Sequence, residues 1–197
     1  NIAEKEIISP WFCVGAYGFN KTEHFLEYFE KISQKNIKGE LSIKCRLGYE
    51  DEQELYNLFP VFNEYPLKNI TIHPRTAVQF YEERVNMKAF REIYYLAKHP
   101  VIFNGDINSW EEFESVCGSF PELEGVMIGR GILRDPFLPE RCFKNFERSI
   151  NGCKEVLKNF TKDIIEEYNK HLKNDASVIG KLKELWQYLS KSFIAYE

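Results

Sequence analysis

The sequence predicts an α/β fold over its first three quarters and an all-helical region at its end. Strand-like and helix-like segments alternate between residues 41 and 133, and the strands recur about every 25 to 30 residues, which leaves room for one helix between parallel strands. Strand-like segments stop after Pro139. We therefore expect a partial TIM-type (β/α) barrel of about four parallel strands in residues 1–145, followed by a small helical domain in residues 146–197.

The first two elements differ in the period of their apolar residues. In residues 21–35, apolar side chains from Phe25 to Ile32 recur at helical spacing between charged residues, which predicts an amphipathic helix. Residues 41–47 read LSIKCRL, in which apolar and polar residues alternate as in a strand. Gly48 ends this strand.

Further helices and strands follow in the same alternation. We expect helices at residues 51–65, 87–99 and 110–120 and strands at residues 69–75, 100–107 and 124–133. Pro60 should break or bend the first of these helices, and Asn108 or Ser109 should cap the last. Two helices separated by a break around Asn174 and Asp175 complete the chain.

Composition excludes several classes of protein. The 197 residues contain no apolar stretch near the roughly 18 to 20 residues of a membrane span, and the N-terminus lacks the order of a signal peptide, so we expect a cytoplasmic protein. Five scattered cysteines without a CxxC pair argue against a disulfide framework and a zinc site. The net charge of -4 argues against binding nucleic acid by bulk charge, although residues 154–193 hold eight lysines against six acidic residues.

Polar side chains gather near the carboxyl ends of the predicted strands, where a parallel sheet places its ligand site. Strands covered on both faces are normally apolar, so polar residues at these positions indicate a specific role. They are Lys44, Arg46, His73, Arg75, Asn104, Asp106 and Arg130. Each one alone could cap a helix or face solvent, but the same pattern on four strands favours a common pocket.

Glycines follow the last two predicted strands. The segments are Asn104-Gly105-Asp106 and Gly129-Arg130-Gly131. A missing Cβ lets backbone N–H groups approach an anion, and the guanidinium adds charge. Because loops after the last two strands of such barrels commonly bind phosphate, the pattern predicts a phosphate-bearing cofactor or substrate.

The amino-acid sequences of these segments resemble those of one protein family. The sequence resembles the second half of the barrel of the tRNA-dihydrouridine synthases in SIKCRLG (42–48), ITIHPRT (70–76) with Gln79 and Tyr81 after it, VIFNGDI (101–107) and GVMIGRGILRDPFL (125–138). It resembles that family's helical tRNA-binding domain in GKLKELWQYL (180–189). The resemblance spans residues 15–192.

The resemblance implies a flavoprotein oxidoreductase that uses FMN, reduced by NADPH, to convert uridine in tRNA to 5,6-dihydrouridine. Lys44 would contact the pyrimidine edge of the flavin, where a cation stabilises the reduced ring, and His73 would lie near the flavin. The residues that would bind the FMN phosphate are Asn104, Gly105, Asp106, Gly129 and Arg130. Arg46 and Arg75 would face the uridine or nearby tRNA phosphates.

The sequence also departs from the family. It contains no Asn-x-Gly-Cys-Pro loop, whose cysteine protonates the uracil ring, and Cys13 is wrongly placed for that role. We assign no catalytic residue, and we expect Cys45 to pack in the core. About 150 residues before the helical tail are too few for the roughly 250 of a complete barrel, so we expect a C-terminal half that is inactive alone. Its open strand edges would pair with an N-terminal half or a second copy.

Other functions fit part of the pattern. A non-catalytic remnant could bind only RNA or a partner, and another phosphate-binding barrel, of sugar-phosphate or pyrimidine metabolism, could use Lys44, His73 and the glycine loops. The lysines of the tail, Lys181 and Lys183 among them, could contact tRNA phosphates or simply face solvent.

Overall fold

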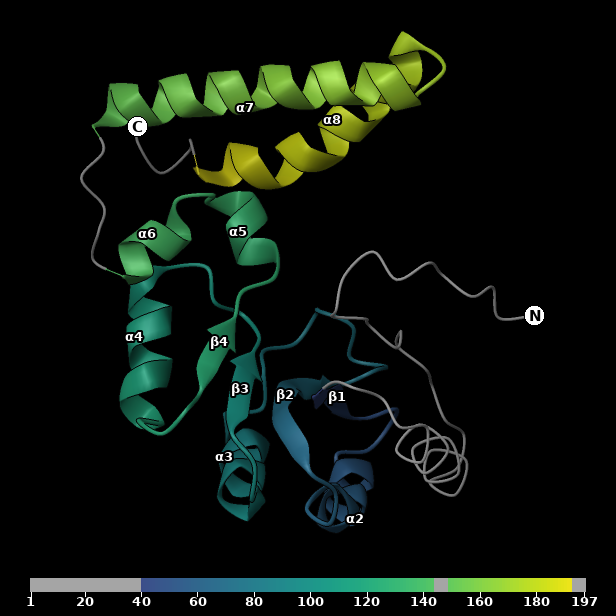
Figure 1. Ribbon diagram of the computed structural model, residues 1–197, viewed down its shortest axis with the longest axis vertical. Helices are drawn as coiled ribbons and strands as arrows, with labels where there is room; N and C mark the ends of the chain where they lie inside the picture. The colour runs from purple at the N-terminus through teal and green to yellow at the C-terminus, as the bar shows by residue number, and fades with distance from the viewer. Residues whose placement is uncertain (1–39, 144–148, 193–197) are drawn as a thin grey trace. The chain divides into compact units, whose positions relative to one another are not determined.

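A computed structural model describes residues 40–143 and 149–192 (Figure 1). The helix expected at residues 21–35 and Cys13 lie outside the described residues. The chain divides into two compact units, residues 1–103 and residues 104–197.

The strands form one four-stranded sheet with the order β1-β2-β3-β4. Their bounds are Leu41–Gly48 for β1, Leu67–Thr76 for β2, Val101–Asn104 for β3 and Gly125–Met127 for β4. The pairings of β1 with β2 and of β2 with β3 are parallel, with Arg46 opposite His73 and Ile72 opposite Phe103. Parallel strands in sequence order confirm the α/β fold expected of a partial barrel.

Two helices cover the strands of the first unit. Helix α2 (Gln53–Phe62) packs against β1, and α3 (Met87–Leu96) packs against β2. The Asn86 side chain caps α3 by accepting a bond from the Ala89 N–H at 3.0 Å. The Phe90 and Phe103 rings meet edge-to-face at 4.9 Å, both fully buried. Each such side chain contributes about 1.5 to 3 kcal/mol by burial, so this aromatic contact anchors α3 to the sheet.

Helix α2 runs through Pro60 and ends at Phe62, so Pro60 does not break the helix, and the alternative of a bend there stays a prediction. A proline inside a helix removes one hydrogen bond, but it does not prevent the apolar side chains around it from packing. Phe59 and Phe62 flank it and are almost fully buried, with ring centroids 5.9 Å apart. The free energy gained by burying these two rings outweighs the cost of the helix hydrogen bond lost at Pro60.

In the second unit a short strand, β4, lies between two helices in the sequence. Helix α4 (Trp110–Ser119) starts at the Ser109 cap, whose hydroxyl accepts from the Glu112 N–H at 3.2 Å. Strand β4 then ends at Met127, so the strand expected over residues 124–133 was too long. From Arg130 to Arg134 the chain forms helix α5 instead. The apolar run has no clear period, and an apolar run of this length fits a strand or a helix equally well.

The C-terminal residues form a helical hairpin, which confirms the expected break near Asn174. After the short helix α6 (Leu138–Cys142), α7 (Ile150–His171) and α8 (Asp175–Leu189) run back along each other, and η1 (Ser190–Ser192) ends the described chain (Figure 1). Leu157 of α7 and Leu189 of α8 are buried together with Phe137, which precedes α6. The boundary at residues 145 and 146 stays a prediction.

No helix in the described part of the chain is both long and apolar enough to cross a membrane.

Candidate functional site

Strands β1 and β2 place three of the expected site residues side by side in the first unit. Arg46 of β1 lies opposite His73 of β2, and Arg75 follows two residues later on the same strand. Residues two apart in a strand share a face, so His73 and Arg75 project to the same side of β2. Both are buried, with 4% and 2% of their surface exposed, whereas Lys44 of β1 is exposed.

Arg75 is held by the segment that follows its own strand. Its Nε donates to the Glu83 carbonyl at 2.7 Å, and its Nη2 donates to the same oxygen. Its Nη1 lies 3.0 Å from His73 Nε2. A guanidinium whose three nitrogens are engaged by two partners is fixed in orientation. Arg75 therefore organises the site, and this part of its role was not expected from the sequence.

Arg46 and Tyr81 complete this cluster, Arg46 half-buried and Tyr81 exposed. Arg46 Nη1 donates to the Thr76 carbonyl at 2.8 Å and to the Phe80 carbonyl at 3.3 Å. The Tyr81 ring lies 5.3 Å from Arg46 Cζ and 5.8 Å from Arg75 Cζ, with 52% of the residue exposed. An aromatic ring beside two guanidiniums presents both a flat face and positive charge, which suits a nucleobase with its phosphate.

We expected no role for Tyr81 from the sequence, although it stands in a segment that carries the resemblance. Its ring centroid lies 6.0 Å from that of His73. Its place in a polar stretch directly after a strand was the signal that could have identified it.

Thr76, the last residue of β2, carries a buried hydroxyl without a hydrogen-bond partner in the described part of the chain. Its backbone groups are satisfied, since its N–H donates to Gln79 Oε1 at 2.7 Å and its carbonyl accepts from Arg46. Only 6% of the residue is exposed. Buried polar side-chain atoms are normally hydrogen-bonded, so this hydroxyl is an exception in the described residues.

In the second unit the loop after β3 lies against the segment after β4, which includes the first residues of α5. The Asn104 side chain donates to the Met127 carbonyl at 2.7 Å. A Cβ added at Gly131 would lie 2.0 Å from the Ile107 carbonyl oxygen, so only glycine allows this approach. The two glycine-containing loops predicted to share a phosphate site are therefore neighbours.

The first of these loops has an unusual backbone. Gly105 has φ 150° and Asp106 has φ 45°, both outside the range that most side chains adopt. At Gly129, in the second loop, an added Cβ would meet no atom of the described residues within 4 Å, so this backbone borders open space in that part of the chain. Exposed Arg130 follows it.

The expected flavin residues thus fall into two sets. Lys44 and His73 belong to the first unit, and the two glycine-containing loops belong to the second. Their convergence on one pocket stays a prediction.

Cys45 lies between Lys44 and Arg46 on β1 and is partly buried. Its thiol lies 3.8 Å from the Thr71 carbonyl. Burial raises the pKa of Cys45 to about 12, against the opposing effect of the Lys44 charge. A neutral thiol in this environment is a poor acid or nucleophile near neutral pH. Because Cys45 is only partly buried, the structure bears out its expected place in the core only in part.

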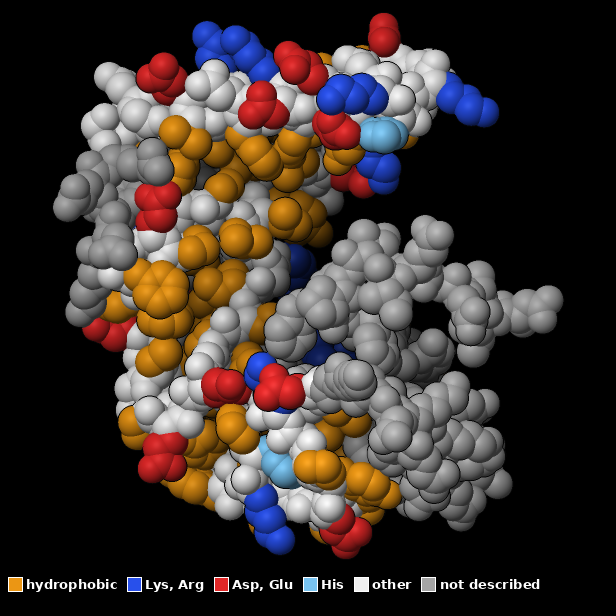
Figure 2. All heavy atoms as spheres, viewed as in Figure 1, with side chains coloured by type: hydrophobic (Ala, Val, Ile, Leu, Met, Phe, Trp, Pro, Cys, Tyr) orange, Lys and Arg blue, Asp and Glu red, His pale blue; other side chains and the backbone are white. Residues whose placement is uncertain are grey.

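The lysines expected to contact tRNA differ from each other. The Lys181 ammonium pairs with the Glu184 carboxylate at 2.9 Å, and this pairing raises the pKa of Lys181. Lys183 is exposed on the same helix. Figure 2 shows acidic and basic side chains interspersed along α7, so this surface is of mixed charge. Of the two lysines, only Lys181 forms an ion pair with another residue of α8 in the described part of the chain.

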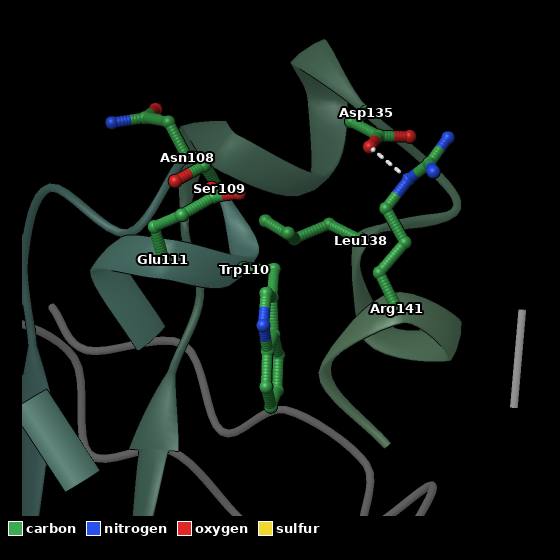
Figure 3. Close-up of a pocket in the computed structure, with 7 residues that line it drawn as sticks. All are labelled: Asn108, Ser109, Trp110, Glu111, Asp135, Leu138 and Arg141. Atoms are coloured by element: carbon green, nitrogen blue, oxygen red, sulfur yellow. Dashed lines mark hydrogen bonds and ion pairs between the residues drawn. The ribbon is translucent and has the colours of Figure 1, made fainter. Parts of the chain in front are cut away.

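A separate hollow of about 490 Å³ lies in the second unit (Figure 3). The Trp110 ring of α4 points into it opposite Leu138, and Arg141 at its rim pairs with Asp135 at 3.0 Å. No residue expected to bind flavin lines it.

Comparison with known proteins adds a second kind of observation. The sequence profile of the dihydrouridine synthase (Dus) family matches residues 14–195. The chain is 26% identical over 155 residues to the tRNA-dihydrouridine(16) synthase of Haemophilus influenzae, covering 78% of this chain and 48% of that protein. It is 28% identical over 157 residues to the protein of the same name from Haemophilus ducreyi, covering 78% and 46%.

A probable tRNA-dihydrouridine synthase of Aquifex aeolicus is 32% identical over 107 residues, covering 54% of this chain and 32% of that protein. The chain thus spans about half the length of the relatives it matches over most of its own length.

Proposed function

The chain belongs to the dihydrouridine synthase family, and from this premise we propose that it forms the FMN-phosphate-binding and tRNA-binding part of a tRNA-dihydrouridine synthase. The observation that carries the proposal is the close packing of the loops after β3 and β4, with Gly131 against the Ile107 carbonyl. Two glycine-containing loops side by side at the ends of neighbouring strands suit a phosphate group.

The residues of the second unit fit a phosphate-bearing flavin. Asn104 fixes the first loop to the strand beside it, and the open space at Gly129 leaves room for a ligand against the backbone. Asn104, Gly105, Asp106, Gly129 and Arg130 would hold the FMN phosphate. When bound, FMN that has been reduced by NADPH supplies the hydride that saturates the uracil ring.

In the first unit, Lys44 and His73 would contact the flavin. The exposed Lys44 ammonium would place positive charge beside the pyrimidine edge of the ring system. His73 is oriented by the contact of its Nε2 with Arg75 Nη1. A buried imidazole fixed in this way presents a constant hydrogen-bonding pattern to its surroundings.

The tRNA substrate would meet the cluster of Arg46, Arg75 and Tyr81. Arg46 keeps donors beyond its bonded Nη1, and the exposed Tyr81 ring offers a face for stacking. Lys183, on the helical hairpin, would add phosphate contact away from the reacting base.

We propose that this chain alone does not reduce uridine. Saturating the C5–C6 bond needs a proton as well as a hydride, and the sequence contains no Asn-x-Gly-Cys-Pro loop to supply a cysteine acid. The raised pKa of Cys45 makes it unsuited to this task.

The phosphate site is tested by comparing FMN with riboflavin, which lacks the phosphate. Quenching of flavin fluorescence should show tighter binding of FMN by the wild-type chain. Arg130→Gln should reduce this preference about tenfold, the loss of one charged hydrogen bond, whereas Arg134→Gln on the same short helix should leave it nearly unchanged. Equal affinity of the wild-type chain for both flavins contradicts the proposed phosphate site.

The activity is tested with unmodified tRNA, FMN and NADPH. We expect salt-sensitive tRNA binding without formation of dihydrouridine. Full turnover by the chain alone contradicts the proposed need for an external proton donor.

A further inference from the structure

One carboxylate holds the turn between β1 and α2. Glu54 Oε1 accepts hydrogen bonds from the backbone N–H groups of Tyr49, Glu50 and Asp51, at 3.1, 2.9 and 3.0 Å. Three donors on one carboxylate oxygen are charge-assisted hydrogen bonds, which are stronger than neutral ones. The Glu54 side chain therefore fixes the path of the chain directly after β1.

The turn is also tight. A Cβ added at Gly48 would lie 2.1 Å from the Asp51 carbonyl oxygen, so the backbone folds closely over itself there. Burial alone would raise the pKa of Glu54, but the three backbone N–H donors outweigh it and lower the pKa. The carboxylate consequently stays ionised at neutral pH and keeps its hydrogen bonds to the turn.

The same turn supports the segment that follows β2. The Gly48 carbonyl accepts from the Ala77 N–H at 2.9 Å, and the Tyr49 carbonyl accepts from the Val78 N–H at 3.1 Å. The Phe80 N–H in turn donates to the Ala77 carbonyl at 3.2 Å. The position of residues 77–80 thus depends on the position of Gly48 and Tyr49.

That second segment carries the contacts of the cationic cluster. The carbonyls of Thr76 and Phe80 both accept from Arg46, and Tyr81 follows immediately with its ring 5.3 Å from Arg46 Cζ. A chain of hydrogen bonds and ring contacts therefore runs from Glu54 through two turns to Arg46 and Tyr81. In the described part of the chain, the hydrogen bonds of the Glu54 side chain go to the turn and not to Arg46 or Tyr81.

We propose that Glu54 is a positioning residue, which holds the turn after β1 and through it the turn after β2, so that Arg46 and Tyr81 present a fixed surface to RNA. The assignment of this surface to RNA rests on the proposed function. The mechanical coupling of the two turns does not.

Amide hydrogen exchange on the full chain tests the coupling. Glu54→Ala should accelerate exchange at residues 49–51, which lose their acceptor, and also at Ala77 and Val78, which do not contact Glu54. We expect about a tenfold increase at Ala77 and Val78, the effect of about one hydrogen bond to a charged group. Glu54→Gln keeps an acceptor oxygen and should recover part of the protection.

Glu50→Gln is the matched control. It removes the same charge from the same turn, and no side-chain contact of Glu50 is found in the described part of the chain, so exchange at Ala77 and Val78 should stay at the wild-type rate. If Glu54→Ala also accelerates exchange in the core of α3, local and global opening cannot be separated, and Glu54→Gln then decides. Unchanged exchange at Ala77 and Val78 in both Glu54 variants overturns the proposal.

A tRNA-binding measurement separates this proposal from the proposed function. We expect Glu54→Ala to weaken tRNA binding about threefold to tenfold and Glu50→Gln to change it much less. Accelerated exchange without any tRNA binding by the wild-type chain would refute the proposed function and leave the coupling supported. Normal tRNA binding by a Glu54→Ala chain with accelerated exchange would refute the positioning role.

Discussion

A methyl group added at Gly131 meets a backbone atom rather than a flexible side chain. The new Cβ of Gly131→Ala would lie 2.0 Å from the Ile107 carbonyl oxygen, whereas carbon and oxygen normally approach to about 3.3 Å. The loops after β3 and β4 must therefore separate by roughly 1 Å. Forcing such a shift costs about 1 to 3 kcal/mol, and the helix propensity of alanine returns at most about 1 kcal/mol.

We expect Gly131→Ala to lower the free energy of unfolding by about 1 to 2 kcal/mol and the melting temperature by roughly 2 to 8 °C. Urea denaturation followed by circular dichroism measures the first quantity. Gly118→Ala in α4 is the control, because an added Cβ there meets no atom of residues 40–143 or 149–192 within 4 Å. It should stabilise the chain by up to about 1 kcal/mol.

FMN binding should fall in Gly131→Ala but not in Gly118→Ala, because only the first substitution separates the two loops. Equal urea midpoints for the two variants would refute the close approach of Gly131 to Ile107. A destabilised Gly131→Ala chain with unchanged FMN affinity would refute the phosphate site alone.

Three further predictions follow from single side chains. Arg75→Lys should lower the free energy of unfolding by about 2 to 3 kcal/mol, because lysine keeps the charge but cannot donate twice to the Glu83 carbonyl. An unchanged urea midpoint would contradict the role of these two hydrogen bonds. Lys183→Gln should weaken tRNA binding and reduce its salt dependence by about one ion. Lys181→Gln should have a smaller effect, because the Lys181 ammonium is already paired with Glu184. Fluorescence anisotropy at about 50 and about 200 mM salt measures both effects, and equal effects of the two variants would contradict this prediction. The thiol of Cys45 has a pKa of about 12 in the folded chain against about 9 when unfolded, so the unfolded state loses its proton first and stability falls as pH rises through this window. Cys45→Ala should remove that part of the pH slope in urea midpoints, and an identical slope contradicts the burial of the thiol.

Much of the fold follows from local patterns in the sequence. The alternation in LSIKCRL predicts β1, and the polar caps Ser109 and Asn174 mark where α4 and α8 begin, because these signals act between residues close in the chain. The order of these elements then implies parallel strands, since a helix between two strands carries the chain back to the same edge. The neighbouring loops after β3 and β4 follow from that order as well.

Other features were decided only by contacts through space. The apolar run after Glu124 does not show where β4 ends, and the chain turns into α5 where Gly131 packs against the Ile107 carbonyl of a distant loop. Likewise, the sequence marked Arg75 as a polar residue in a strand but not that the Glu83 carbonyl would hold it. The periodic pattern of side chains determined which elements form, whereas the backbone atoms that meet when those elements pack determined how the site is held, because a carbonyl group leaves no trace in the identity of its residue.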